Sequence, residues 1–127
     1  MAETLTIKNT TKGKPPRLPF ASIKDRILGK SYELSLVFIG SRRSRALNKV
    51  YRKKDTPTDV LSFPLSKKEG EIFIDLSVAR HKAPLFDEKY SNFIGFLFIH
   101  GLLHLKGFDH GSTMEHEEKK FRKIFRI

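Results

Sequence analysis

Hydrophobic and polar positions along the chain predict an alternation of strands and helices. Residues 5–9 alternate between apolar and polar, which is typical of a short strand. Residues 20–28 carry apolar side chains at helical spacing and are followed by Gly29, so a helix is predicted there. Residues 33–39 are rich in β-favouring side chains and predict a central strand. The first third of the chain is therefore predicted to run strand, helix, strand.

The middle of the chain predicts one helix and a hairpin. Ser41 has the side chain of an N-cap for a helix over residues 42–53. Residues 59–63 predict a strand that Pro64 stops, and residues 71–75 alternate as a second strand. The short loop between these two strands indicates an antiparallel pair.

The rest of the chain predicts three helices. Asp75 or Ser77 is placed to cap a short one. A long helix should follow over residues 87–105, and because it is apolar on almost every side it should be buried. Ser112 with Glu115 three residues later forms a capping-box pattern for the final helix.

Length and composition fit a single globular domain over residues 1–127, with a core of useful size. The chain has no cysteine, which fits a reducing compartment, and we expect a cytoplasmic protein. The N-terminal stretch lacks the apolar run of a signal peptide, and no segment reaches the ~20 apolar residues of a membrane span. No membrane partner is therefore expected.

Positive charge is concentrated in the first half. The net charge is +11, and residues 1–63 contain 14 basic and 5 acidic side chains, against 11 and 9 in residues 64–127. This imbalance favours a polyanionic partner, with nucleic acid as the first expectation. A solvated helix face can look the same. The basic side chains that fall on one side of the predicted helix over residues 42–53 are Arg42, Arg45, Lys49, Arg52 and Lys53.

Candidate chemistry is concentrated in the stretch HGLLHLKGFDH, which holds three of the five histidines. His100 and His104 are four residues apart, so on a helix their rings project from one face. Gly107 can adopt the left-handed conformation that closes a helix, and this would bring His110 back toward the first two rings. Three imidazoles with one coordination position left open are typical of a catalytic zinc site.

Two other interpretations of the histidines remain open. The spacing matches that of zincin-type proteases, but the position of their general-base glutamate is occupied by Gly101, so peptide hydrolysis would need a carboxylate from elsewhere. A closed structural site would need a fourth ligand from His81, His116 or a carboxylate.

Two blocks of the sequence are similar to a known family. Residues 46–64, ALNKVYRKKDTPTDVLSFP, and residues 100–110, HGLLHLKGFDH, resemble the motifs of the YbeY family of metal-dependent endoribonucleases, the ribosomal RNA maturation factors. Gly70-Glu71-Ile72 resembles that family's G-D-I strand start, with Glu in place of Asp.

The resemblance implies an α+β fold, in which a four-stranded, mostly parallel mixed sheet packs against about five helices, one of them a zincin-like metal helix. It implies that His100, His104 and His110 bind one Zn²⁺, or another divalent transition metal, and that Arg52 is a catalytic residue. Arginine suits this role because its planar fork matches two phosphate oxygens. The implied activity is endonucleolytic cleavage of single-stranded RNA in ribosomal RNA processing, at the small-subunit RNA 3′ end, and in ribosome quality control.

The implied partners are ribosomal RNA and the small ribosomal subunit, together with ribosomal proteins or a ribosome-assembly GTPase. Asp109 is a candidate hydrogen-bond partner for a histidine ring. Two further functions remain open: a zinc peptidase of zincin type, and a ribosome-binding factor whose metal is only structural. The candidate substrate-binding residues are Arg42, Arg45, Asn48, Lys49 and Asp59.

Overall fold

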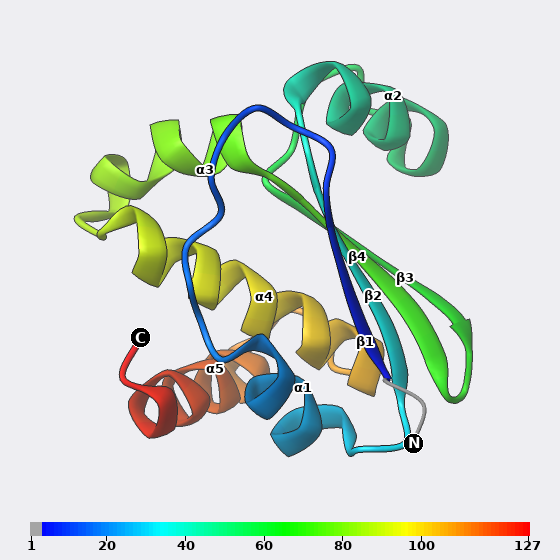
Figure 1. Ribbon diagram of the computed structural model, residues 1–127, viewed down its shortest axis with the longest axis vertical. Coiled ribbons are helices and arrows are strands. Elements are labelled where there is room, and N and C mark those ends of the chain that lie inside the picture. The colour runs from blue at the N-terminus through cyan, green and yellow to red at the C-terminus, as the bar shows by residue number, and fades with distance from the viewer. Residues whose placement is uncertain (1–3) are drawn as a thin grey trace.

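The computed structural model describes residues 4–127, which form one sheet and a set of helices (Figure 1). The strands are β1 (Leu5–Asn9), β2 (Glu33–Ile39), β3 (Val60–Ser66) and β4 (Glu69–Asp75). The helices are α1 (Phe20–Leu28), α2 (Ser41–Arg52), α3 (Leu76–Lys82), the 3₁₀ helix η1 (Ala83–Phe86), α4 (Tyr90–Lys106) and α5 (Ser112–Phe125).

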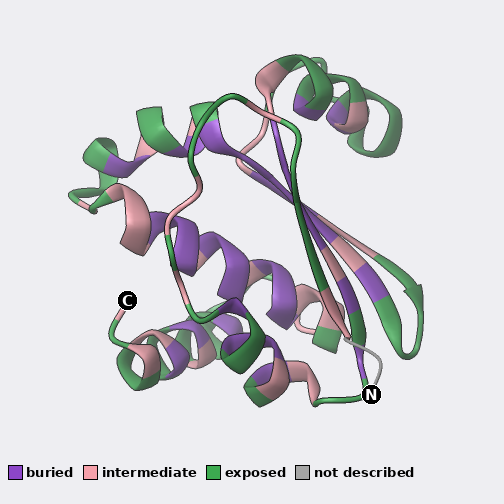
Figure 2. Cartoon of the chain, viewed as in Figure 1, coloured by how far each residue is buried: buried purple, intermediate pink, exposed green. Residues whose placement is uncertain are grey.

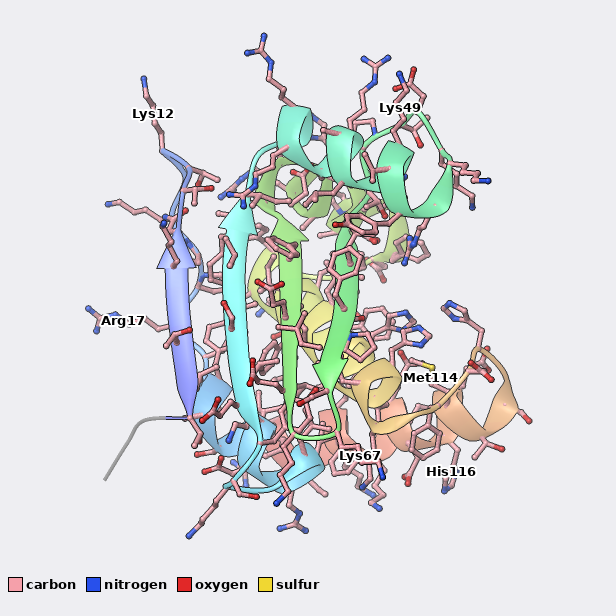
Figure 3. All side chains as sticks on the ribbon, turned by 90° about the vertical axis from the view of Figure 1, so that its right-hand side faces the viewer. Lys12, Arg17, Lys49, Lys67, Met114 and His116 are labelled. Atoms are coloured by element: carbon pink, nitrogen blue, oxygen red, sulfur yellow. The ribbon has the colours of Figure 1, made fainter. Side chains whose placement is uncertain are left out.

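The four strands form a mixed sheet in the order β1-β2-β4-β3. β1 and β4 both pair with β2 in parallel, while β3 pairs antiparallel with β4 at the edge. Helices α1, α4 and α5 lie on one face of the sheet, and α2 lies over one end of the other face (Figures 1 and 3). The predicted fold class, a mostly parallel four-stranded sheet packed with about five helices, is confirmed.

Helix α4 is the centre of the main core. Nine of its seventeen residues are buried, as its apolar sequence predicted (Figure 2). Phe98 contacts Phe20 of α1 edge to face at 5.0 Å, which ties the two helices together under the sheet. No helix within residues 4–127 is both long and apolar enough to cross a bilayer.

Helix α2 packs differently from the pattern of its sequence, in which the apolar residues Leu47, Val50 and Tyr51 fall opposite the basic side chains and are expected to face inward. Leu47 packs against a small core on the second face of the sheet, but Val50 and Tyr51 are 70% and 63% exposed. The residues that α2 buries are polar: the Ser44 hydroxyl donates to Asp75 at 2.6 Å, and Asn48 is buried beside it. The prediction was wrong because α2 is attached to the end of the sheet by hydrogen bonds.

Two predicted boundaries, the start of a helix and the end of a strand, were also wrong. Gly40 and not Ser41 is the N-cap of α2, because Ser41 already lies in the helix. Strand β3 does not stop at Pro64 but continues to Ser66, with a register shift between these residues. Proline is tolerated there because β3 is an edge strand, where a missing N–H leaves no neighbouring strand unpaired.

The N-terminal ends of helices α3, α4 and α5 agree only in part with the ends predicted from the sequence. Asp75 caps α3 as predicted, and its carboxylate accepts a hydrogen bond from the backbone N–H of Val78. Helix α4 begins at Tyr90, because Asp87 ends η1 in the left-handed conformation. The capping box is absent from α5, whose N-cap is Gly111 with no side-chain hydrogen bond.

Candidate metal centre

Two imidazoles face each other on the C-terminal half of α4. His100 and His104 are one helical turn apart, and their Nε2 atoms are 3.1 Å apart. The ring centroids are 4.6 Å apart and the ring planes are nearly perpendicular. Both side chains are partly buried, so the helix presents the two rings at the edge of the core rather than inside it.

The other nitrogen of each ring is held by a hydrogen-bond acceptor. Nδ1 of His100 donates to Oε2 of Glu118 at 2.7 Å, and Nδ1 of His104 donates to the backbone carbonyl oxygen of Phe108 at 3.0 Å. A carboxylate and a carbonyl can only accept, so in the neutral rings the proton is on Nδ1 and the Nε2 lone pairs are free. Two lone pairs that face each other at 3.1 Å repel one another, and a cation bound by both nitrogens would remove this repulsion.

The turn after α4 completes the group. Gly107 has φ +109°, and its N–H donates to the carbonyl of His104, as predicted for a left-handed helix end. The same turn places the Phe108 carbonyl against His104. It also brings the exposed ring of His110 to 5.1 Å from His100 and 4.6 Å from His104, measured between centroids.

The donor set fits a single divalent transition metal. One nitrogen from each of the three histidines lies within 4.8 Å of the others. Zn–N bonds of 2.0–2.1 Å in a tetrahedral site place two nitrogens about 3.3 Å apart, close to the separation of the two Nε2 atoms on α4. Within residues 4–127 no fourth histidine or carboxylate joins this group. His116 projects from the outer side of α5 (Figure 3) and His81 bonds to Ser77 on α3.

The pKa of His104 favours the neutral form that a metal requires. Burial lowers the pKa of this imidazole below its ordinary value, and the neighbouring His100 lowers it further. The hydrogen bond to Phe108 opposes this change, while His110 and Arg52 add to it. The exposed guanidinium of Arg52, at the end of α2, is therefore close enough for its charge to act on the histidine group.

Gly101, which stands where a zincin has its general base, faces away from the histidines. A Cβ atom built on this glycine would lie 3.0–3.3 Å from three side-chain atoms of Ile72 on β4. Helix α4 packs so closely on the sheet here that a glutamate side chain has no room. A peptidase base at this position is excluded by packing as well as by residue type.

The basic residues predicted on α2 are exposed along the helix. Arg42, Arg45 and Lys49 are all exposed, and Lys49 projects from the side away from the sheet (Figure 3). The Arg45 guanidinium donates to both oxygens of Asp55, at 2.8 and 3.2 Å. Because both groups are more than half exposed, this pair contributes little to stability, and a phosphate can replace the carboxylate.

The remaining candidates have different environments. Asn48 is 2% exposed and its amide N–H donates to the carbonyl of Thr56, so it holds the loop after α2 in place. Asp59 forms an ion pair with Lys82 at 3.1 Å. Among the described residues Asp109 forms no side-chain hydrogen bond to a histidine; the carboxylate in contact with a ring is that of Glu118.

Sequence reasoning missed Glu118, although the sequence carries a signal for it. Met114, Glu118 and Phe121 form the buried side of α5, at helical spacing. A carboxylate on the buried side of an amphipathic helix needs a partner, because burying an unpaired charge is costly. A histidine that binds a metal through one ring nitrogen offers such a partner, because its other ring nitrogen carries a proton.

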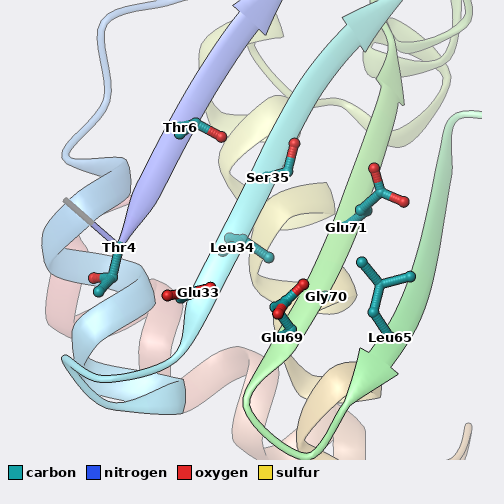
Figure 4. A pocket seen from close by; sticks show the side chains of 9 residues that line it. All are labelled: Thr4, Thr6, Glu33, Leu34, Ser35, Leu65, Glu69, Gly70 and Glu71. Atoms are coloured by element: carbon teal, nitrogen blue, oxygen red, sulfur yellow. The ribbon is translucent and has the colours of Figure 1, made fainter. Parts of the chain in front are cut away.

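A hollow in the described residues lies elsewhere, on the uncovered part of the second sheet face (Figure 4). It has a volume of about 300 Å³ and contains three glutamates, Glu33, Glu69 and Glu71, beside Thr6 and Ser35. A group of carboxylates repels phosphate. This hollow is therefore a poor site for a nucleic acid backbone.

Comparisons with known proteins show which proteins this chain is similar to. The model of the family described as Endoribonuclease YbeY matches residues 18–126. A protein of that name from Geobacillus kaustophilus is 39% identical over 106 residues, which is 72% of this chain and 67% of the relative. One from Oceanobacillus iheyensis is 35% identical over 118 residues, 81% of this chain and 75% of the relative. The solution structure of a Thermotoga maritima protein has a TM-score of 0.65 at 27% identity and covers 92% of this chain and 85% of its own.

Proposed function

This chain belongs to the Endoribonuclease YbeY family, and on that premise we propose that it is a metal-dependent endoribonuclease that acts in ribosomal RNA maturation. The observation that carries the proposal is the arrangement of the imidazoles. His100 and His104 present free Nε2 lone pairs 3.1 Å apart, and His110 completes a set of three donors. Three protein donors leave the fourth tetrahedral position to a water or a phosphate oxygen.

Zinc is the metal we propose, with nickel, cobalt and manganese as the other divalent candidates. The bound ion would polarise a phosphate oxygen, or lower the pKa of a bound water toward ~7. The protein supplies the rest. Glu118 and the Phe108 carbonyl fix the ring orientations, and the Arg52 guanidinium stabilises negative charge on the phosphate in the transition state.

The exposed basic side of α2 is the proposed track for the RNA backbone. Arg42, Arg45 and Lys49 extend along the same helix whose last residue is Arg52. RNA phosphates bound along α2 would direct the RNA strand toward the histidines. Ribosomal RNA of the small subunit is the proposed substrate, with ribosomal proteins or an assembly GTPase as the partners that select the cleavage position.

The test compares wild-type protein with His104→Ala. We expect the variant to lose both bound metal, measured by mass spectrometry of the purified protein, and cleavage of a structured ribosomal RNA fragment. His81→Ala is the matched control, because it removes an exposed histidine outside the group and should keep both properties. Circular dichroism checks that each variant is folded. Loss of metal with unchanged cleavage would contradict catalysis by the metal.

A further inference from the structure

A second cavity, of about 260 Å³, lies beside the metal centre and has no role in the mechanism above. It is slightly smaller than sites for drug-sized ligands, which are typically about 300–1,000 Å³. It is formed by η1, α4, α5 and the start of β3. Its lining residues are Asp59, Phe86, Glu88, Phe93, Phe96 and Arg122.

An unbroken row of aromatic rings connects this cavity to the metal centre. Phe86 stacks on Phe93 with centroids 5.7 Å apart and planes 14° from parallel. Phe93 lies 6.0 Å from Phe96, and Phe96 lies 5.9 Å from the ring of His100. Phe96 therefore lies between the cavity and the histidine group.

Phe86 is unusual in this row because it is 64% exposed, while Phe93 is buried. On the other side of the cavity, the Arg122 guanidinium lies 5.2 Å from the Phe96 centroid and donates to Oε1 of Glu88 at 2.7 Å. The cavity thus offers flat surfaces from both an exposed phenylalanine and a guanidinium. Flat aromatic and guanidinium groups are what stack unpaired nucleobases in RNA-binding proteins.

Apart from the Arg122 guanidinium, which donates, the polar groups that line the cavity accept hydrogen bonds. Among the contacts of residues 4–127, one oxygen of Asp59 bonds to Lys82 and one oxygen of Glu88 to Arg122, and the second oxygen of each carboxylate has no hydrogen bond. Carboxylate oxygens match the amino groups of guanine, adenine and cytosine, and they face the carbonyl oxygens of uracil unfavourably.

We propose that this cavity binds one unpaired, amino-bearing nucleobase of the RNA, next to the phosphate held at the metal centre. The inference rests on the proposed endoribonuclease function and adds a specificity-determining subsite to it. Phe86 supplies the stacking surface, and Asp59 and Glu88 select against uracil. Base stacking in such a subsite makes the enzyme favour single-stranded or looped RNA, because a paired base is not free to enter.

The experiment is a double-mutant cycle that combines the protein change Phe86→Ala with removal of single bases from the RNA. Zinc-loaded protein is titrated with fluorescent 2′-O-methyl RNA hexamers, one intact and the others abasic at one position each, and anisotropy gives Kd while gels check that the RNA stays intact. We expect Phe86→Ala to weaken binding of the intact hexamer about tenfold, and not to weaken binding of the hexamer that lacks the stacked base. Leu85→Ala is the matched control, since Leu85 is 80% exposed in the same η1 and does not line the cavity.

Base preference tests the carboxylates. With the four bases placed in turn at the coupled position, uracil should bind about fivefold more weakly than the others, and Asp59→Asn should reduce this difference. If Phe86→Ala weakens binding of every abasic hexamer equally, or does not weaken binding at all, the proposed subsite is wrong. If that variant also cleaves ribosomal RNA with unchanged KM, the endoribonuclease function stands without the subsite. If wild-type protein neither binds nor cleaves RNA, both fail.

Discussion

The two polar regions of the molecule are built in opposite ways. At the metal centre, three imidazoles can offer nitrogen lone pairs to a cation, and the positive charge of Arg52 lies close to them. In the hollow on the second sheet face, Glu33, Glu69 and Glu71 form an acidic surface between strands (Figure 4). A chain of net charge +11 therefore has a distinctly acidic region. Net charge predicts the class of partner, and the local arrangement decides where that partner binds.

Strand alternation explains the acidic region. In β2, Leu34 and Leu36 point to the face covered by helices, and Glu33 and Ser35 point to the other face. Helix α2 covers only one end of that second face, where Val37 is buried, so the polar end stays open (Figure 3). The metal centre, in contrast, depends on helices α4 and α5, which come from the last third of the chain.

Arg52→Ala should have the largest effect of the changes considered for these two regions. We expect cleavage of ribosomal RNA to fall by a factor of about 10²–10³, because a charged donor to the transition state is lost. Bound zinc should stay the same, since Arg52 is not a ligand. Single-turnover kinetics with metal analysis measure both quantities. Arg52→Lys should restore only part of the rate, because it keeps the charge but not the planar fork; full activity of Arg52→Ala would remove the residue from the mechanism.

Glu118→Ala should act on the metal itself. Loss of the acceptor that orients His100 is expected to weaken zinc affinity by a factor of about 10–100. Competition with a zinc-binding dye gives the dissociation constant. Glu118→Gln keeps an acceptor oxygen but no charge, so its loss should be smaller. The neighbouring Glu117, which pairs with Lys120 at 3.4 Å, supplies the control Glu117→Gln, and equal affinity of all three variants would show that the contact is only structural.

Removing three charges on α2, and in a second variant three charges in the acidic hollow, tests whether RNA affinity depends on where the charges lie or only on the net charge. A variant with Arg42, Arg45 and Lys49 changed to Gln should bind RNA about tenfold more weakly at 0.15 M salt and show a shallower dependence on salt. Anisotropy at several salt concentrations measures both. A weakening without any change in the salt dependence would mean that α2 does not contact phosphates.

The matching change in the acidic hollow should have a much smaller effect. Glu33, Glu69 and Glu71 changed together to Gln should raise RNA affinity by a factor of about two or less, because salt screens charges beyond ~8 Å. Cleavage of free RNA and zinc content should not change. A large gain in affinity would show that RNA lies along this face of the sheet.

The smallest effect concerns pH. The lowered pKa of His104 means that, below about 6.5, the metal-free folded protein binds fewer protons than the unfolded chain. The contribution of His104 to stability is therefore full above the unfolded pKa and is lost as the pH falls through the folded pKa. Urea unfolding at pH 7.5 to 5 should show a steeper loss for wild type than for His104→Gln. Parallel curves would contradict the lowered pKa.

Much of the site was predictable from local sequence. The spacing of His100, His104 and Gly107 fixes the geometry of one helix face and its end, and these are short-range properties of the backbone. The burial of α4 also followed from its composition. In contrast, Ser41, Pro64 and Ser112 were assigned wrong boundary roles, because neighbouring strands and loops decided where those elements begin and end.

The sequence by itself determined the order of elements, the helix that is buried and the three imidazoles, because each depends on contacts within a few residues. Only the tertiary structure decided that Glu118 meets His100, that Ile72 fills the space beside Gly101, and that Phe86 begins an aromatic row toward the metal centre. These contacts join residues from different elements of the fold. Their positions depend on how α4, α5 and the sheet pack, which local residue patterns do not encode.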